Sequence, residues 1–174
     1  MSGQPPLEIE RKYLIEMPDH ALLSTFEAAE ATEITQTYLK PDETGMMRRV
    51  RKRGSECRGW QYTYTRKKTV GFGKRIEIED EVAEARYQAL LQEAHPTMHP
   101  ISKVRWTFRY QGQFFELDVY TISDTLATLE IELPDIDTPV TLPPQLHVLA
   151  DVTGKRGFSN FALSQNGAFP TEIA

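Results

Sequence analysis

Apolar and polar residues alternate with a period of two along most of this chain. In the stretch LEIERKYLIE at residues 7–16, Glu8, Glu10 and Lys12 fall on one side of a strand and mainly apolar residues on the other. Successive side chains of a strand point to opposite faces, so neighbouring charges on one face lie about 7 Å apart. The same alternation predicts strands near residues 7–16, 34–40, 46–53, 59–68, 74–82, 102–110, 113–121 and 126–133.

Shorter segments follow a helical period instead. They are residues 18–29, 84–95, 144–154 and 159–164. Asp19 is the expected N-cap of the first, and Gln111-Gly112 is the expected turn of a hairpin between two strands. Many strands with few helices predict an α+β fold with a mainly antiparallel sheet.

The chain is long enough for one well-packed domain. Its 174 residues include 40% apolar and 26% charged residues. We expect a loose lead-in at residues 1–6, a single domain at residues 7–165 and a C-terminal tail at residues 166–174. No apolar run is long enough to cross a bilayer and no signal pattern opens the chain, so we expect a cytoplasmic protein.

Cysteine, histidine and net charge exclude several classes of function. Cys57 is the single cysteine, and the four histidines, His20, His95, His99 and His147, lack the spacing of a zinc site. The formal net charge of −5 argues against general attraction to nucleic acid or anionic lipid. An anionic ligand must therefore meet a local cluster of cations.

Charges on the polar side of each predicted strand are mostly of one sign. The groups are Glu8 and Glu10; Arg49, Arg51 and Arg53; Glu77, Glu79 and Glu81; Lys103 and Arg105; Glu116 and Asp118; and Glu130 and Glu132. A half-solvated antiparallel sheet explains the alternation in any single strand. Neighbours of the same sign repel each other, however, and a face that only meets water has no need of them. A binding site does.

A barrel that turns this charged face inward accounts for the pattern. Charges held inside a barrel must be paired with each other or with a ligand. Carboxylates bind hard divalent cations, and arginines bind phosphate oxygens. Acidic and basic rows together suit a metal-bound polyphosphate.

A series of short motifs runs along the chain. They are Glu-x-Glu-x-Lys at 8–12, QTYL at 36–39, RRVRKRG at 48–54, TRK at 65–67, RIEIEDEV at 75–82, SKVRW at 102–106, FELDVY at 115–120 and LEIEL at 129–133. In this order they resemble the CYTH superfamily, the triphosphate tunnel metalloenzymes, over about residues 7–163. The resemblance implies an eight-stranded antiparallel β-barrel with a charged interior and helices packed outside. It also implies Mg²⁺ or Mn²⁺ as cofactor.

The resemblance assigns roles to individual residues. The implied metal ligands are Glu8, Glu10, Asp118, Glu130 and Glu132, with Glu77, Glu79 and Glu116 as secondary candidates. The implied phosphate ligands are Lys12, Arg49, Arg51, Lys67, Lys103 and Arg105, with Arg75 in support. Tyr38 is expected to handle a proton or partner a lysine, and Lys103 either holds phosphate or orients water.

The C-terminal motif departs from the family pattern. Members commonly read Val-Thr-Gly-Asp-x-Arg-Tyr-x-Asn, whereas residues 152–160 read VTGKRGFSN, with Gly157 at the arginine position. Lys155 or Arg156 then supplies the cation from a shifted place. A register change of one residue would likewise turn Lys68 rather than Lys67 inward.

The leading hypothesis is a divalent-metal-dependent triphosphatase acting on inorganic tripolyphosphate or a small organic triphosphate. The opening motif and compact length resemble the bacterial inorganic triphosphatase branch. One alternative is a class IV adenylate cyclase, and another is a triphosphate-binding module without catalysis. Neither nucleic acid nor a membrane is an expected partner, and the sequence gives no support for a homodimer.

Overall fold

The computed structural model describes residues 9–71 and 74–173, and its main elements are strands. The strands are β1 (Ile9–Glu16), β2 (Glu27–Tyr38), β3 (Met47–Ser55), β4 (Gly59–Gly71), β5 (Lys74–Val82), β6 (Ile101–Tyr110), β7 (Gln113–Tyr120), β8 (Leu126–Leu133) and β9 (Val148–Asp151). The helices are α1 (His20–Leu23), α2 (Glu84–Leu91), the 3-10 turn η1 (Arg156–Phe158) and α3 (Asn160–Asn166). No helix in this part of the chain is long and apolar enough to cross a membrane.

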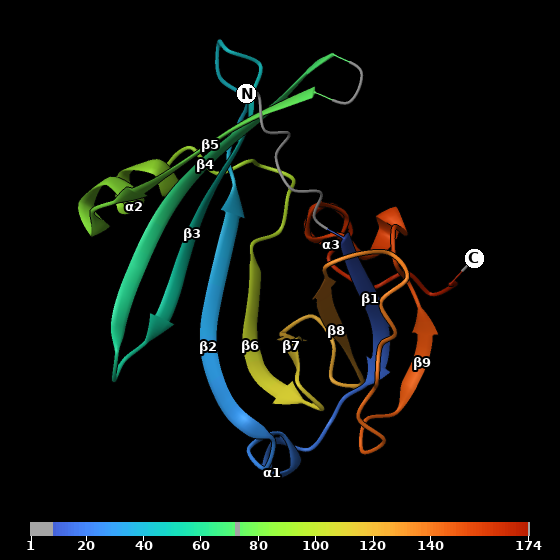
Figure 1. Cartoon of the computed structure of the whole chain (residues 1–174). Coiled ribbons are helices and arrows are strands. Elements are labelled where there is room, and N and C mark those ends of the chain that lie inside the picture. Colours follow the sequence, from blue (N-terminus) through green and yellow to red (C-terminus); the bar gives the residue numbers. More distant parts are fainter. Residues whose placement is uncertain (1–8, 72–73, 174) are drawn as a thin grey trace, which may run out of the picture.

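All of these strands belong to one antiparallel sheet, in the order β5-β4-β3-β2-β6-β7-β8-β1-β9. The sheet curls strongly, with β4 and β5 on one side, β8, β1 and β9 on the other, and α3 inside the curve (Figure 1). Over the described ranges no ladder joins β5 to β9, so hydrogen bonds do not close the sheet into a complete barrel. The predicted α+β class with an antiparallel, barrel-like sheet is confirmed, with β9 as an additional short strand.

The apolar faces of the strands form the core on the convex side of the sheet. Phe108 stacks on Phe26 at 4.3 Å and on Phe115 at 5.6 Å between ring centroids. A second cluster lies under α2, where Tyr87 and Leu90 pack with residues of β3 and β4. Burial of these side chains leaves the opposite, charged face on the concave side.

The C-terminal segment covers one end of the concave face. Leu163 of α3 packs against Ile101 and Tyr120, and Phe158 of η1 packs against Leu14. Ser159 caps α3, because its hydroxyl accepts a hydrogen bond from the Ala162 amide at 3.1 Å. This segment therefore forms a wall over one end of the charged sheet.

The helix expected at residues 18–29 is wrong beyond Leu23. Asp19 caps α1 as predicted, accepting from the Ala21 amide at 2.9 Å. The Ser24 and Thr25 hydroxyls then donate hydrogen bonds to backbone carbonyls of α1, and such side-chain bonds compete with continuation of the helix. The chain instead enters β2 and pairs with β6, so tertiary pairing outweighs the local helical pattern.

The helix expected at residues 144–154 is also wrong. Val148–Asp151 forms β9, which pairs with β1. The edge strand β1 has backbone N–H and C=O groups that need hydrogen-bond partners. A strand at residues 148–151 supplies these partners, whereas a helix there would not. The helices expected near residues 84–95 and 159–164 are confirmed as α2 and α3, and the turn at Gln111-Gly112 closes the β6–β7 hairpin with positive φ at both residues.

Candidate functional site

The ladder registers place the charged residues of the strands on one face of the sheet. Pairs such as Gln36 with Arg51, Arg105 with Asp118, and Lys12 with Glu130 lie directly opposite each other on neighbouring strands. The charged residues of this face include Glu10, Lys12, Arg49, Arg51, Arg53, Lys67, Glu77, Glu79, Glu81, Lys103, Arg105, Glu116, Asp118, Glu130 and Glu132. Lys67 lies opposite Glu77 and Met47 on this face. Lys68 lies opposite Ile76 and alternates to the other face in the ladder, but it lines the same cavity as Lys67.

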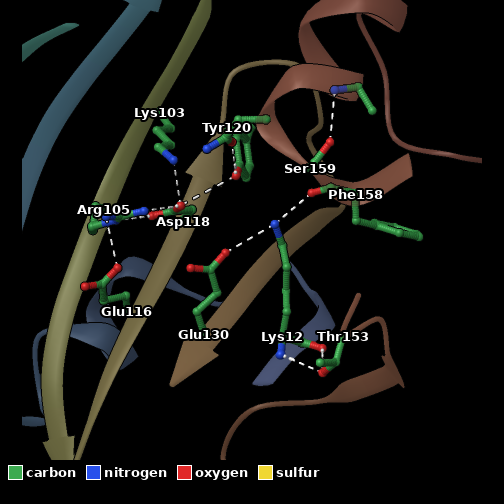
Figure 2. Close-up of polar contacts among 12 residues, drawn as sticks. Lys12, Lys103, Arg105, Glu116, Asp118, Tyr120, Glu130, Thr153, Phe158 and Ser159 are labelled. Carbon is green, nitrogen blue, oxygen red and sulfur yellow. Dashed lines mark hydrogen bonds and ion pairs between the residues drawn. The ribbon is translucent and has the colours of Figure 1, made fainter. Parts of the chain in front are cut away.

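A buried ion-pair network occupies the middle of the face (Figure 2). The Asp118 carboxylate accepts hydrogen bonds from Lys103 Nζ at 2.9 Å and from Arg105 Nε and Nη2 at 2.8 and 2.9 Å. Arg105 Nη1 also lies 2.9 Å from Glu116. The side chains of Lys103 and Asp118 are only 1% and 2% exposed, so this network is shielded from water.

The network fixes the protonation of its members. Burial alone would raise the pKa of Asp118, but the Lys103 ammonium and the Arg105 guanidinium outweigh burial and hold that pKa well below its usual value. Burial lowers the pKa of Lys103, and Asp118 offsets part of this effect. Asp118 is therefore ionised and already occupied by two cations.

Lys12 connects the sheet to the C-terminal segment. Its Nζ donates to the Phe158 carbonyl at 2.7 Å and lies 3.2 Å from Glu130 (Figure 2). Its backbone amide donates to Thr153 Oγ1 at 2.9 Å. These contacts hold the Lys12 ammonium at the inner end of the charged face.

A large cavity with a basic lining, the cation cavity, lies between β3–β4 and the start of α3. Its volume is about 850 Å³. The lining residues are Tyr38, Gly45, Met47, Arg49, Lys67, Lys68, Ser159, Asn160 and Phe161. Its volume is within the range of small-molecule sites, and its charge suits an anion.

Two arginines at this end lack carboxylate partners. Neither Arg49 nor Arg51 forms an ion pair within the described part of the chain, and the Nε of each is buried without a hydrogen-bond partner there. Arg51 Nη2 donates to the side-chain Oε1 of Gln36 at 3.1 Å. Burial and the neighbouring Arg49 lower the pKa of Arg51 to about 10. Buried guanidinium groups without counter-ions favour a bound anion.

Tyr38 lies opposite Arg49 on the neighbouring strand and is 4% exposed. Its hydroxyl accepts from Gln36 Nε2 at 3.4 Å. Burial raises the pKa of Tyr38, and the nearby Arg49 offsets only part of this effect. Tyr38 is thus a phenol at neutral pH, able to donate a hydrogen bond to an anion.

A second cavity, the acidic cavity, lies at the far side of the ion-pair network. It has a volume of about 260 Å³ and is lined by Glu10, Phe114, Glu116, Glu130, Ile131 and Glu132. Burial and the surrounding carboxylates raise the pKa of Glu10 and of Glu116. Among residues 9–71 and 74–173, no three acidic, histidine or cysteine side chains lie close enough together, as they stand, to hold a metal ion.

Of the other residues expected at the site, some are not described and some do not line the two cavities. Glu8 falls outside the described residues. Arg75 lies in β5 opposite Thr69, but the described part of the structure does not include its side chain. Lys155 contacts the Ile173 carbonyl, and neither Lys155 nor Arg156 lines the two cavities. Glu77 lies 3.7 Å from Lys67, and Glu79 accepts from Thr65 at 2.8 Å, both away from the acidic cavity.

Steric crowding explains the glycine at position 157, where the C-terminal motif differs from the family pattern. A Cβ atom added to Gly157 would lie 2.8 Å from Cγ of Pro170, which is too close for any larger residue without a shift. Residues that sequence reasoning missed, Ser159, Asn160 and Phe161, line the cation cavity in its place. The sequence signals for them were the expected helix at residues 159–164 and, for Asn160, the final asparagine of the C-terminal motif.

Comparisons with known proteins agree with this geometry. The model of the CYTH domain family matches residues 6–139. Two structures of the protein NE1496, one described as a hypothetical protein and one as an inorganic triphosphatase, are 25% identical to this chain with a TM-score of 0.66. They cover 94% of this chain, and the alignments span 100% and 97% of their own chains.

A more distant structure is the PH1819 protein of Pyrococcus horikoshii OT3. It has a TM-score of 0.47 and 18% identity, over 74% of this chain and 81% of its own. The comparison with curated proteins finds no match.

Proposed function

This chain belongs to the CYTH domain family, and from that premise we propose that it is a divalent-metal-dependent triphosphatase. The substrate is inorganic tripolyphosphate or another small triphosphate, which water cleaves to release phosphate. The similarity to a structure named inorganic triphosphatase supports this choice. We also propose a cytoplasmic location, and the formal net charge of −5 argues against a nucleic-acid partner.

The observation that carries the proposal is a pair of arginines, Arg49 and Arg51, that form no ion pair within residues 9–71 and 74–173 and whose Nε atoms are buried there without a hydrogen-bond partner. Arg49 lines the cavity of about 850 Å³, and Arg51 follows it on the same face of β3. Leaving such groups without a partner costs more than an ordinary hydrogen bond gains, so the arrangement is best explained by an anion that completes it. A phosphate chain offers several charged oxygens for this purpose.

The basic residues have distinct roles in this proposal. Arg49, Arg51 and Lys67 bind phosphate oxygens in the cation cavity, and Lys12 and Arg105 extend the positive charge along the face. Hydrolysis spreads negative charge over the transferred phosphoryl group, and fixed cations lower the free energy of that transition state. Arg75 supports them from β5.

The acidic cavity provides the metal ligands in this proposal. Glu10, Glu130 and Glu132 supply the hard oxygen donors that Mg²⁺ or Mn²⁺ prefers, with Glu8 as a further donor. Burial and, after it, repulsion from Glu130 raise the pKa of Glu10, and a bound cation would relieve that repulsion. Binding requires these side chains to draw together. A bound divalent cation supplies charge neutralisation and activation of water.

Tyr38 and Lys103 act on protons and water rather than on the metal. Because burial raises the pKa of Tyr38, its hydroxyl stays protonated and donates a hydrogen bond to a phosphate oxygen. Lys103 is held by Asp118 and contributes fixed positive charge to the middle of the face. Asp118 then serves mainly to position Lys103 and Arg105.

Product analysis tests the proposal. The purified protein is incubated with tripolyphosphate or ATP in Mg²⁺, Mn²⁺ or chelator, and orthophosphate, diphosphate and cyclic AMP are measured. Metal-dependent orthophosphate release is the expected result. Cyclic AMP with diphosphate would instead identify a cyclase, and tight binding with no product would identify a binding module.

A matched pair of variants in β3 tests the cation cavity. Arg51→Gln removes a charge-assisted contact, and we expect kcat/KM for tripolyphosphate to fall about 10- to 100-fold. Lys52→Gln, the next residue on the opposite face, should leave kcat/KM within about twofold, because a surface charge contributes little. Equal effects of the two variants would contradict the assignment.

A further inference from the structure

Tyr120, at the end of β7, is a buried polar residue that the proposed function does not use. Its ring meets Phe169 edge to face, with ring centroids 5.5 Å apart, and the residue is only 2% exposed. The hydroxyl lies 3.5 Å from Asp118 Oδ2 (Figure 2) and donates a shorter hydrogen bond, of 2.9 Å, to Asn160 Oδ1. Tyr120 therefore joins the buried ion-pair network to the first residue of α3.

The contact with Tyr120 determines which end of the Asn160 amide is free. A tyrosine hydroxyl has one proton to donate, and here the nearer acceptor is Asn160 Oδ1. The opposite end of the amide, Nδ2, carries two protons, and it donates to no protein group within residues 9–71 and 74–173. Because Asn160 lines the cation cavity, this N–H group is available to an anion that binds there.

The other residues that the C-terminal segment adds to the cation cavity have no such group. The Ser159 hydroxyl donates to the Arg156 carbonyl at 2.8 Å, and Phe161 has an apolar side chain. In the described part of this segment, Asn160 is thus the cavity residue whose side chain keeps a donor for a ligand.

Backbone contacts on both sides of α3 hold Asn160 in place. Lys12 Nζ donates to the Phe158 carbonyl at 2.7 Å, just before the helix begins. Farther along the helix, the His99 amide donates to the Ser164 carbonyl at 2.7 Å. The backbone of Asn160 is therefore fixed before any ligand binds, and rotation of its side chain is the freedom that the tyrosine hydroxyl restricts.

We propose that Tyr120 is a positioning residue of the phosphate site, which holds the Asn160 amide with Nδ2 toward the anion in the cation cavity. This inference rests on the proposed function and adds a neutral donor to its binding groups. An N–H group that donates to an anionic oxygen forms a stronger hydrogen bond than one between two neutral groups. Fixing the amide beforehand avoids the entropic cost of ordering it when the ligand binds. Tyr120 thereby acts on the anion without touching it.

A double-mutant cycle tests the proposal by binding alone. Calorimetry in metal-free buffer gives the Kd of tripolyphosphate for wild type, Tyr120→Phe, Asn160→Ala and the double variant. We expect Asn160→Ala to raise Kd about tenfold, as for the loss of a hydrogen bond to a charged group. Tyr120→Phe keeps the ring and should raise Kd about threefold, because the amide must then be ordered by the ligand. In the Asn160→Ala background, Tyr120→Phe should have no further effect on Kd, because the two residues act through one contact.

Two further variants of α3 form a matched pair. Asn160→Asp and Asn166→Asp each exchange an amide for a carboxylate of the same shape, but Asn166 is exposed and does not line the cation cavity. Asn160→Asp should raise the Kd of tripolyphosphate about 100-fold, because it replaces a donor by a negative charge beside the phosphates. Asn166→Asp should leave Kd within about twofold, since an exposed charge contributes little.

The outcomes separate this inference from the proposed function. An unchanged Kd in Asn160→Ala, or the same loss from Tyr120→Phe in both backgrounds, would overturn the inference and leave the triphosphatase proposal standing. Absence of phosphate release by a protein that binds tripolyphosphate would overturn the triphosphatase proposal, and the binding cycle would still support the role of Tyr120. Wild-type protein that does not bind tripolyphosphate would overturn both.

Discussion

At the scale of single residues, Asp118 illustrates how the site is held together before any ligand binds. Its two oxygens are shared between Lys103 and Arg105 in an almost fully buried network. The resemblance to the CYTH family implies Asp118 as a metal ligand, and this role stays a prediction. The observed contacts of Asp118 also suit a role in positioning the two cations.

Substitution of Asp118 should be costly for stability. Asp118→Asn leaves Lys103 and Arg105 without their main counter-charge, and we expect the free energy of unfolding to fall by about 3–5 kcal/mol. Asp151→Asn breaks an exposed pair with Arg11 and should cost less than about 1 kcal/mol. Urea denaturation measures both, and similar losses would contradict the importance of the buried network.

The raised pKa of Glu10 predicts that the free energy of unfolding depends on pH. Burial and the carboxylates of Glu130, Glu132 and Glu116 raise its pKa above 4.5, while Lys12 offsets part of the shift. Ionisation therefore destabilises the folded state, and this cost appears as pH rises from about 4.5 through the raised pKa. Glu10→Gln should stabilise the metal-free protein at pH 7 by less than about 1 kcal/mol, because the group is partly exposed.

The pH series supplies the control for Glu10. Near pH 4 wild type and Glu10→Gln should unfold at nearly the same temperature, because the carboxyl is mostly protonated in both states. With Mg²⁺ or Mn²⁺ at pH 7 we expect the order to reverse, since the cation stabilises only the wild-type cluster. A variant that is less stable than wild type at pH 7 without metal would argue against repulsion at Glu10.

At the scale of elements, the β3–β4 hairpin carries the arginines and depends on one glycine. Gly54 has a φ of 141°, and a Cβ added there would lie 2.1 Å from the Gly59 carbonyl oxygen. Gly54→Ala should destabilise the protein by about 2–3 kcal/mol, through strain and through this clash. Gly112→Ala, at φ 74° with no atom within 4 Å, should cost about 1 kcal/mol. Thermal unfolding distinguishes the two, and equal costs would refute the steric argument.

Elements also show where local patterns lose to tertiary pairing. Residues 24–29 and 144–154 have helical spacing, yet the first segment leads into β2 and the second contains β9. Each lies beside a strand whose backbone groups need partners. The strands themselves were predictable, because alternation with period two is a local property of the extended chain.

At the scale of the whole molecule, a chain with net charge −5 gathers Arg49, Lys67 and Lys68 around one cavity of a curved sheet. The acidic cavity gathers carboxylates on the other side of the ion-pair network. This separation lets one concave face attract an anion and a cation together. The net charge of the chain predicts neither the attraction of an anion nor that of a cation to this face.

Ligand binding should therefore stabilise the whole fold in a salt-dependent way. At a tripolyphosphate concentration 100 times its Kd in metal-free buffer, the free energy of unfolding should rise by about 2.7 kcal/mol. This corresponds to an increase in Tm of roughly 5–10 °C for a domain of this size. The increase should shrink between 50 and 500 mM salt as screening grows. An unchanged Tm at low salt would contradict the cation cavity as a polyphosphate site.

The sequence by itself determined which side chains share a face, because the geometry of an extended chain sends alternate residues to opposite sides. It therefore predicted the sheet and its charged face, which includes Arg49, Arg51 and Glu10. Only the tertiary structure decided that α3 lies inside the curve, that two cations already contact Asp118, and that residues of β2, β3, β4 and α3 line one cavity. Those features depend on packing between residues far apart in the chain, which no local pattern encodes.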